Sequence, residues 1–312
     1  MKKNTIVIMI LLCVASLFIW LLASHPTPTQ HQTSLEAKIH IVASFYPVAE
    51  FARAVGGELV DVTTITPAGT EPHDYEPNAQ QVSSVYSSDI FLYNGGGVDA
   101  WATRIASDVA LHRSTVVELS KTIPVVQPAA GSEDPNAVFD PHFWLDPVLA
   151  QKEVLLIEQT LAQKDALHAE LYKKNADDYV AKLIELDQSY KTGLSSCKNN
   201  TVVTSHAAFA YLAKEYDFEV IPISGFSPEE EPSAGRLAEI AKLAKQKNIK
   251  YIYFETLASP KLSETIAREI GAKTLVFNPL EGVSAEDQAL GKNYLTIMQE
   301  NLTNLKTGMV CQ

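Results

Sequence analysis

Residues 166–197 read ALHAELYKKNADDYVAKLIELDQSYKTGLSSC. Their helical pattern divides the chain into a part before this segment and a part after it. Apolar residues recur on one helical face, namely Ala176, Tyr179, Val180, Leu183 and Tyr190. Opposite charges four residues apart support the exposed side, in the pairs Glu170/Lys174, Asp178/Lys182 and Asp187/Lys191. A flexible linker would be richer in Gly, Ser and Pro. We therefore predict a rigid helix that joins two lobes, as the second half of a helical region at 147–194 that breaks near residues 164–165.

Short β-like runs alternate with helical patterns on both sides of this region. Such alternation predicts parallel sheets covered by helices. The strand candidates are residues 39–44, 60–65, 90–93 and 115–118 in a first series and 201–205, 219–223, 251–254 and 274–277 in a second. The expected fold class is α/β, with two lobes that each hold a parallel β-sheet flanked by helices, joined by a long rigid backbone helix. We place the N-terminal lobe at 38–165, the connecting helix at 166–197 and the C-terminal lobe at 198–312.

The first 24 residues have the composition of a signal or membrane anchor. Lys2 and Lys3 precede an apolar run at residues 6–23, close to the roughly 20 residues that span a bilayer. The basic flank would stay in the cytoplasm and place the rest of the chain outside. Three fates remain open: an uncleaved anchor, lipidation at Cys13, or cleavage after Ser24. Residues 25–37 are predicted to form a flexible tether.

The net charge and the cysteines indicate which kind of ligand to exclude and which disulfide to expect. The formal charge of −12 at pH 7 argues against nucleic acid, because phosphate binding needs clustered Lys and Arg. Of the three cysteines, Cys13 lies in the apolar run. Cys197 and Cys311 would face an oxidising space after export, so we predict a disulfide between them.

Three of the eight histidines lie in loops next to a strand or at a helix start: His73, His142 and His206. His73 and His206 follow strands, and ligands bind at the carboxyl ends of parallel strands. These two strands belong to different lobes, so the histidines would face a common cleft. The remaining histidines are assigned elsewhere. His25 and His31 fall in the tether, His112 and His168 occupy exposed helix positions, and His40 lies on a strand surface.

A carboxylate is expected to complete this group. Glu281 follows the strand at 274–277, and Glu255, at the end of the strand at 251–254, is its rival. Asp74 and Glu71, beside His73, are weaker candidates. A zinc hydrolase would use Glu255 or Glu281 as a general base and would keep one metal position for water.

Six strings resemble the metal-binding solute-binding proteins of zinc and manganese ABC importers. They agree in order and spacing over residues 38 to about 306 and read SFYPVAEFARAVGG, GTEPHDYEPNAQQV, DPHFWLDP, SHAAFAYLAKEY, EEEPSAGRLAEI and NPLEG. The resemblance implies a two-lobed fold with a rigid backbone helix and a metal held between the lobes by three His and one carboxylate. On the matching motifs, these ligands are His73, His142, His206 and Glu281.

The resemblance also implies a function. We expect an extracytoplasmic zinc-binding protein that is monomeric, is not an enzyme, and delivers the ion to an ABC-type permease in the membrane. Three imidazoles and a carboxylate suit Zn²⁺. Manganese-type members tend to have a carboxylate where this chain has His206, so Mn²⁺ is the weaker candidate. The alternatives are a manganese or iron receptor of the same fold and a zinc hydrolase.

Two features of the family are weak or absent in this sequence. Some members are described as adhesins, but nothing here marks an adhesive surface. Many zinc-type members carry a long His-rich loop before the second ligand, whereas residues 127–140 form a short segment without His.

Overall fold

The computed structural model describes residues 37–126 and 139–312. The predicted anchor at 1–24, the tether at 25–37 except Ala37, and most of the loop at 127–140 therefore lie outside the described residues. In the described part, no helix combines the length and apolar character needed to cross a bilayer. Residues from Lys38 to Gln312 form one unit with two parallel sheets, so the predicted α/β class is confirmed.

The first sheet has the strand order β2-β1-β3-β4, and all its pairings are parallel. Its strands are β1 (Ile39–Ala43), β2 (Val60–Thr64), β3 (Ile90–Tyr93) and β4 (Thr115–Glu118). The helices of this half are α2 (Tyr46–Gly56), α3 (Ala79–Tyr86) and α4 (Ala100–Leu111). Short 3₁₀ turns follow two elements, η1 (Gly57–Leu59) and η2 (Leu119–Thr122). All four residues of β3 are buried, as expected for a strand covered on both faces.

The second sheet repeats this topology as β6-β5-β7-β8, again fully parallel. Its strands are β5 (Thr201–Thr204), β6 (Glu219–Pro222), β7 (Tyr251–Phe254) and β8 (Lys273–Val276). Its helices are α7 (Ala210–Glu215), α8 (Ala234–Gln246), α9 (Lys261–Ile270), α10 (Ala285–Ala289) and α11 (Tyr294–Met309). All eight predicted strands are present. In each sheet the chain reverses its direction of growth beside β1 or β5, and such reversals are where ligands bind.

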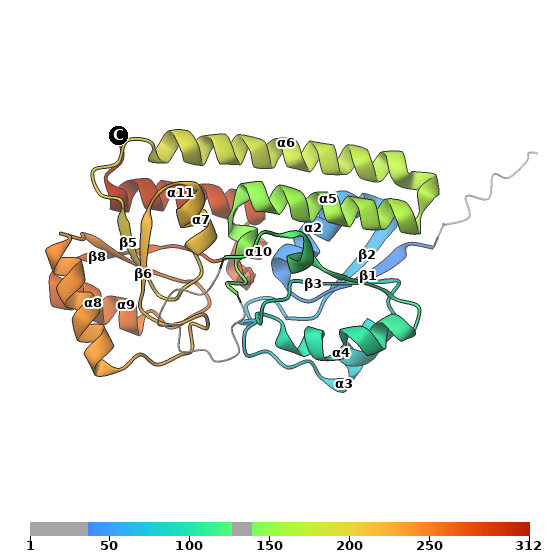
Figure 1. Ribbon diagram of the computed structural model, residues 1–312, viewed down its shortest axis with the longest axis horizontal. Helices are drawn as coiled ribbons and strands as arrows, with labels where there is room; N and C mark the ends of the chain where they lie inside the picture. Colours follow the sequence, from blue (N-terminus) through green and yellow to red (C-terminus); the bar gives the residue numbers. More distant parts are fainter. Residues whose placement is uncertain (1–36, 127–138) are drawn as a thin grey trace, which may run out of the picture. The chain divides into compact units, whose positions relative to one another are not determined.

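Two antiparallel helices connect the sheets, α5 (Pro147–Lys164) and α6 (Ala169–Leu194). The turns η3 (Phe143–Leu145) and η4 (Ala166–His168) precede them. In Figure 1 both helices run along one side of the two sheets, and α11 lies beside them. The break falls at Asp165, as predicted, and the apolar face of α6 is buried. The predicted disulfide is confirmed, and Cys197–Cys311 joins the end of α6 to the end of α11.

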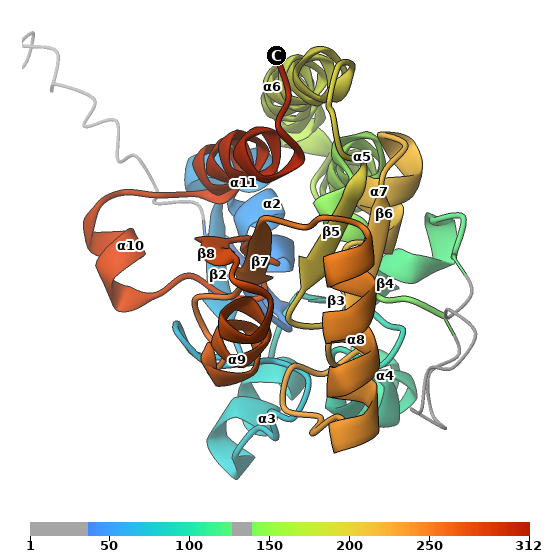
Figure 2. The same ribbon diagram turned by 90° about the vertical axis from the view of Figure 1, so that its left-hand side faces the viewer.

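The largest hydrophobic cluster is shared by both halves. It extends from Phe51 of α2, through Ile157 of α5 and Leu183 of α6, to Leu212 of α7 and Leu302 of α11. Two smaller clusters lie on the opposite sheet faces, one under α8 and α9 and the other under α3 and α4. Figure 2 shows α5, α6 and α11 on one side of the second sheet and α8 and α9 on the other. The two halves therefore share one hydrophobic core on the side of the sheets that carries α5, α6 and α11.

One helix begins later than its sequence suggests. The residues after His206 predict a helix from Ala207, but α7 starts at Ala210. The Ala207 N–H donates to the Gly225 carbonyl oxygen at 2.8 Å. The Thr204 hydroxyl donates to the His206 carbonyl oxygen, also at 2.8 Å. These contacts keep residues 206–209 out of the helix, and the buried His206 side chain bonds to Glu255 and Glu281 instead.

Candidate metal centre

His73 lies in the loop between β2 and α3. Backbone turns shape this loop, with Thr70 N–H donating to Pro67 and Tyr75 N–H donating to Pro72. The His73 N–H donates to Glu71 Oε1 at 3.3 Å. The His73 side chain is 7% exposed, whereas those of His142 and His206 are fully buried. His73 is therefore the candidate ligand nearest to solvent.

His142 lies directly before η3 and α5. The Asp140 Oδ1 atom accepts two hydrogen bonds from it, one from its backbone N–H at 2.9 Å and one at Nδ1 at 2.8 Å. A carboxylate on Nδ1 fixes the ring orientation and leaves Nε2 as the free donor atom for a metal. Asp140 was not singled out from the sequence, although its place two residues before a candidate ligand could have drawn attention to it.

His206 follows β5 and has an equivalent arrangement. Its Nδ1 is 2.5 Å from Glu255 Oε1, and the same oxygen accepts a hydrogen bond from the Ser205 hydroxyl. Glu255, at the end of β7, therefore lies behind the His206 ring and orients it. The sequence left Glu255 as a rival of Glu281 for the metal, but in the structure Glu255 contacts the Nδ1 atom of His206 instead.

Glu281 lies in the loop after β8, in a constrained turn. The preceding Leu280 is fully buried and has a φ of 58°, a left-handed conformation that costs a leucine free energy. The Asn278 side chain accepts the Leu280 N–H at 2.8 Å, and Asn301 bonds both the N–H and the carbonyl of Asn278. On the other side, a Cβ at Gly282 would lie 3.0 Å from Leu257. The Glu281 backbone is thus fixed from both sides.

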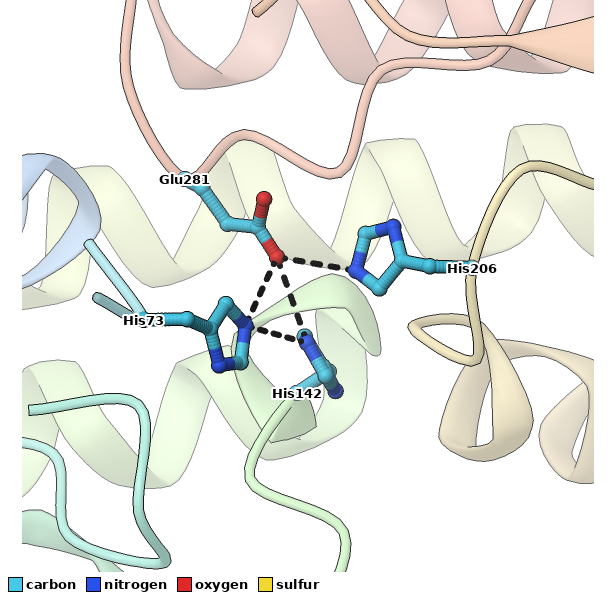
Figure 3. Close-up of side chains that lie close together, drawn as sticks. All are labelled: His73, His142, His206 and Glu281. Atoms are coloured by element: carbon cyan, nitrogen blue, oxygen red, sulfur yellow. Dashed lines mark hydrogen bonds and ion pairs between the residues drawn. The ribbon is translucent and has the colours of Figure 1, made fainter. Parts of the chain in front are cut away.

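The four side chains, which come from loops of both halves of the protein, converge on one point (Figure 3). The Glu281 Oε1 atom is 3.2 Å from His73 Nε2, 3.2 Å from His142 Nε2 and 3.1 Å from His206 Nε2. The Nε2 atoms of His73 and His142 are 3.2 Å apart. A tetrahedron with metal–ligand bonds of about 2.0–2.1 Å has edges of about 3.3–3.4 Å. Four of the six distances between donor atoms are therefore close to the edges of a tetrahedron around a small cation, and all the donor atoms lie within 4.8 Å of one another.

The pKa values of these groups reflect mutual attraction. Burial alone would raise the pKa of Glu281, but His206 and the other two histidines hold it well below its usual range. Burial lowers the pKa of His206, but Glu255 and Glu281 outweigh burial and raise it well above its ordinary value. The two carboxylates therefore favour the charged form of His206.

The other histidines and the weaker acidic candidates behave differently. Burial would lower the pKa of His142, but Asp140 and then Glu281 raise it overall, whereas burial lowers the pKa of His73. Burial, and then the charge of Glu281, raises the pKa of Glu71 to about 10, so this carboxyl is neutral at pH 7. Asp74 is exposed and accepts a hydrogen bond from Ser227. Neither Glu71 nor Asp74 joins the group of donor atoms.

Comparison with known proteins gives a consistent assignment. Residues 41–308 match the family described as zinc-uptake complex component A, periplasmic. The high-affinity zinc uptake system protein ZnuA of Bacillus subtilis is 39% identical over 284 residues, which cover 88% of this chain and 88% of that protein. The zinc-binding lipoprotein AdcA of Streptococcus pneumoniae is 40% identical over 286 residues, but this chain spans only 57% of that protein.

Solved structures agree in fold. The crystal structure of the Zn(II)-bound ZnuA-like domain of Streptococcus pneumoniae AdcA has a TM-score of 0.77 and 40% identity, and the match covers 88% of this chain and 99% of that one. The family match extends over most of the described residues, and it includes both sheets and all four converging side chains. This chain belongs to the ZnuA family, the periplasmic component A of zinc-uptake complexes.

Proposed function

We propose that this protein is the extracytoplasmic receptor of a zinc importer. It captures one Zn²⁺ with His73, His142, His206 and Glu281 and hands the ion to an ABC-type permease. The observation that carries the proposal is the spacing of 3.1–3.2 Å between Glu281 Oε1 and each of the three imidazole Nε2 atoms. Those distances suit the edges of a zinc tetrahedron.

The ligand set favours transport over catalysis. Four protein donors fill a tetrahedral shell, whereas catalytic zinc keeps one position for a water molecule. Glu255, the candidate general base of a hydrolase, is instead engaged by His206 and Ser205. Family membership points the same way, because the family is that of an uptake component.

Zinc is favoured over manganese by the donor chemistry. Mn²⁺ prefers carboxylate, carbonyl and water oxygens, whereas imidazole suits Zn²⁺. Three of the four converging donors are imidazole nitrogens. A manganese or iron receptor of the same fold is the runner-up, and it would need Mn²⁺ or Fe²⁺ to displace Zn²⁺ in competition.

The organisation of the chain is part of the proposal. We propose an N-terminal lobe at 38–165, a connecting helix at 166–197 and a C-terminal lobe at 198–312, supported by the separate sheets and by α6. We also propose a monomer that residues 1–37 tether to the outer face of the membrane. Light scattering would test the monomer, and membrane fractionation with and without residues 1–24 would test the tether.

The site is tested by zinc titration against a competing chelator, using purified protein stripped of metal. His142→Ala, His206→Ala and Glu281→Ala should each weaken zinc binding by orders of magnitude. The matched control is His112→Ala, because His112 is exposed on the surface at the end of α4. Wild-type protein that binds no zinc, or ligand variants that bind like the control, would refute the assignment. Manganese titration of the same proteins would separate the runner-up.

A further inference from the structure

The segment Asp140–Trp144, which carries His142, is held at both ends by residues of the C-terminal half. At its start, the Tyr211 hydroxyl of α7 donates to the Asp140 carbonyl oxygen at 2.8 Å. At its end, the Trp144 indole N–H donates to the Pro279 carbonyl oxygen at 2.8 Å. The Tyr294 hydroxyl of α11 donates to the Trp144 carbonyl oxygen at 2.6 Å. The Asn94 side chain, which follows β3, also donates to the Pro141 carbonyl oxygen at 2.9 Å. His142 is therefore positioned from both halves of the protein, with three of these hydrogen bonds coming from residues that follow α6.

Tyr211 contacts the residue whose carboxylate orients the candidate ligand. Its hydroxyl also accepts the Val126 N–H at 2.9 Å, and the Asp140 N–H donates to the Val126 carbonyl at 3.0 Å. Tyr211, Val126 and Asp140 thus form a closed ring of three hydrogen bonds. Tyr211 is 3% exposed, and its ring packs edge-on against Phe143 at 6.3 Å. Burial makes each of these bonds costly to lose, because no water replaces the missing partner.

The ring of hydrogen bonds acts on His142 through Asp140. The Asp140 carbonyl bonds to Tyr211, while its carboxylate bonds to the Nδ1 and the N–H of His142. A shift of the Asp140 backbone would therefore rotate the His142 ring and move its Nε2 from the centre. Tyr211 also lies five residues after His206, so one short stretch of chain fixes the surroundings of two candidate ligands.

We propose that Tyr211 is a positioning residue for zinc binding, which sets the His142 ring through the Asp140 backbone from the opposite half of the protein. This inference rests on the proposed function of the site. Tyr211 touches no metal ligand side chain, so its removal distorts the site without removing a donor atom.

The experiment compares Tyr211→Phe with Tyr216→Phe. Tyr216 is the C-cap of the same helix, is 8% exposed, and donates its hydroxyl to Asp187 Oδ1 at 3.0 Å. Both variants lose one buried hydroxyl and keep the aromatic ring. Tyr211→Phe loses two hydrogen bonds and Tyr216→Phe loses one, so both should lower thermal stability, and Tyr216→Phe controls for the loss of a buried hydroxyl on the same helix. Zinc affinity, measured by chelator competition, should fall about tenfold in Tyr211→Phe, at the lower end of the range for groups that orient metal ligands. It should stay unchanged in Tyr216→Phe.

A spectroscopic readout separates positioning from general loosening. Cobalt(II) in the site should give a visible ligand-field band whose intensity and position change in Tyr211→Phe and match wild type in Tyr216→Phe. Asp140→Asn combined with Tyr211→Phe should weaken zinc binding by less than the product of the single effects, because both act on His142. Equal affinities and equal cobalt spectra in the two tyrosine variants would overturn the inference, while wild-type protein that binds no zinc would overturn the proposed function instead.

Discussion

Removing the disulfide between Cys197 and Cys311 should lower the stability of the protein by a calculable amount. The change is Cys197→Ser with Cys311→Ser. The bridge closes a loop with a sequence separation of 114 residues, which in the chain-entropy treatment corresponds to about 4.8 kcal/mol at 25 °C. Unfolding of the roughly 275 residues from Lys38 to Gln312 has an entropy of about 0.58 kcal/mol/K, so Tm should fall by about 8 °C.

The assay is thermal unfolding of metal-free wild type and double variant, followed by circular dichroism. Metal must be absent, because bound zinc would raise Tm by mass action and hide part of the difference. Zinc affinity should not change, because the bridge joins the C-terminal ends of α6 and α11 and neither cysteine belongs to the group of converging donor atoms. A Tm decrease below about 2 °C would refute the reasoning, since it would mean that the bridge hardly restricts the unfolded chain.

Three further predictions concern buried ionisable side chains. Glu255→Gln should weaken zinc binding by about 10–100-fold, less than Glu281→Ala does, because it loosens His206 without removing a donor; equal losses would make Glu255 a ligand. Glu153 is fully buried, neither carboxyl oxygen has a described hydrogen-bond partner, and burial raises its pKa well above the usual value. The folded state then holds a proton that the unfolded state loses above a pH of about 4.5, so the stability of the wild type falls as pH rises. Glu153→Leu removes this dependence, and its gain in the free energy of unfolding, measured with urea, should be larger at pH 8 than at pH 5. Equal gains at the two pH values would contradict the raised pKa. Zinc binding at pH 7 should release protons, because nearby carboxylates raise the pKa values of His206 and His142 and zinc needs both rings neutral. Calorimetry in buffers of different ionisation enthalpy would measure the release, and binding without proton release would contradict the raised pKa values.

Much of the fold follows from local sequence pattern. The strands are short apolar runs whose ends are visible in the sequence, and the apolar face of α6 can be read at helical spacing from Ala176 to Tyr190. The start of α7 could not be read in this way, because it depends on the Ala207 N–H bonding to Gly225 in another loop. A contact between distant segments overrides the local preference there.

The candidate site shows the same division. Positions after strands single out His73 and His206, since the carboxyl ends of parallel strands share an edge. The same rule could not separate Glu281 from Glu255, because both follow neighbouring strands. The resemblance of the motifs favours Glu281, and the three-dimensional arrangement gives the physical reason: the Glu255 carboxylate reaches Nδ1 of His206, and the Glu281 carboxylate reaches Nε2 of the same ring. Which ring nitrogen a carboxylate meets is not encoded in spacing along the chain.

The hydrophobic cluster common to both halves affects how empty and loaded receptors compete for the permease. A wide opening that exposed even about 500 Å² of this cluster would cost about 12 kcal/mol, on the order of the stability of a whole domain. We therefore expect empty and loaded receptors to present nearly the same outline. Empty copies would then compete with loaded ones for a limited number of transporters, and uptake would follow the ratio of loaded to empty receptors rather than the number of loaded ones.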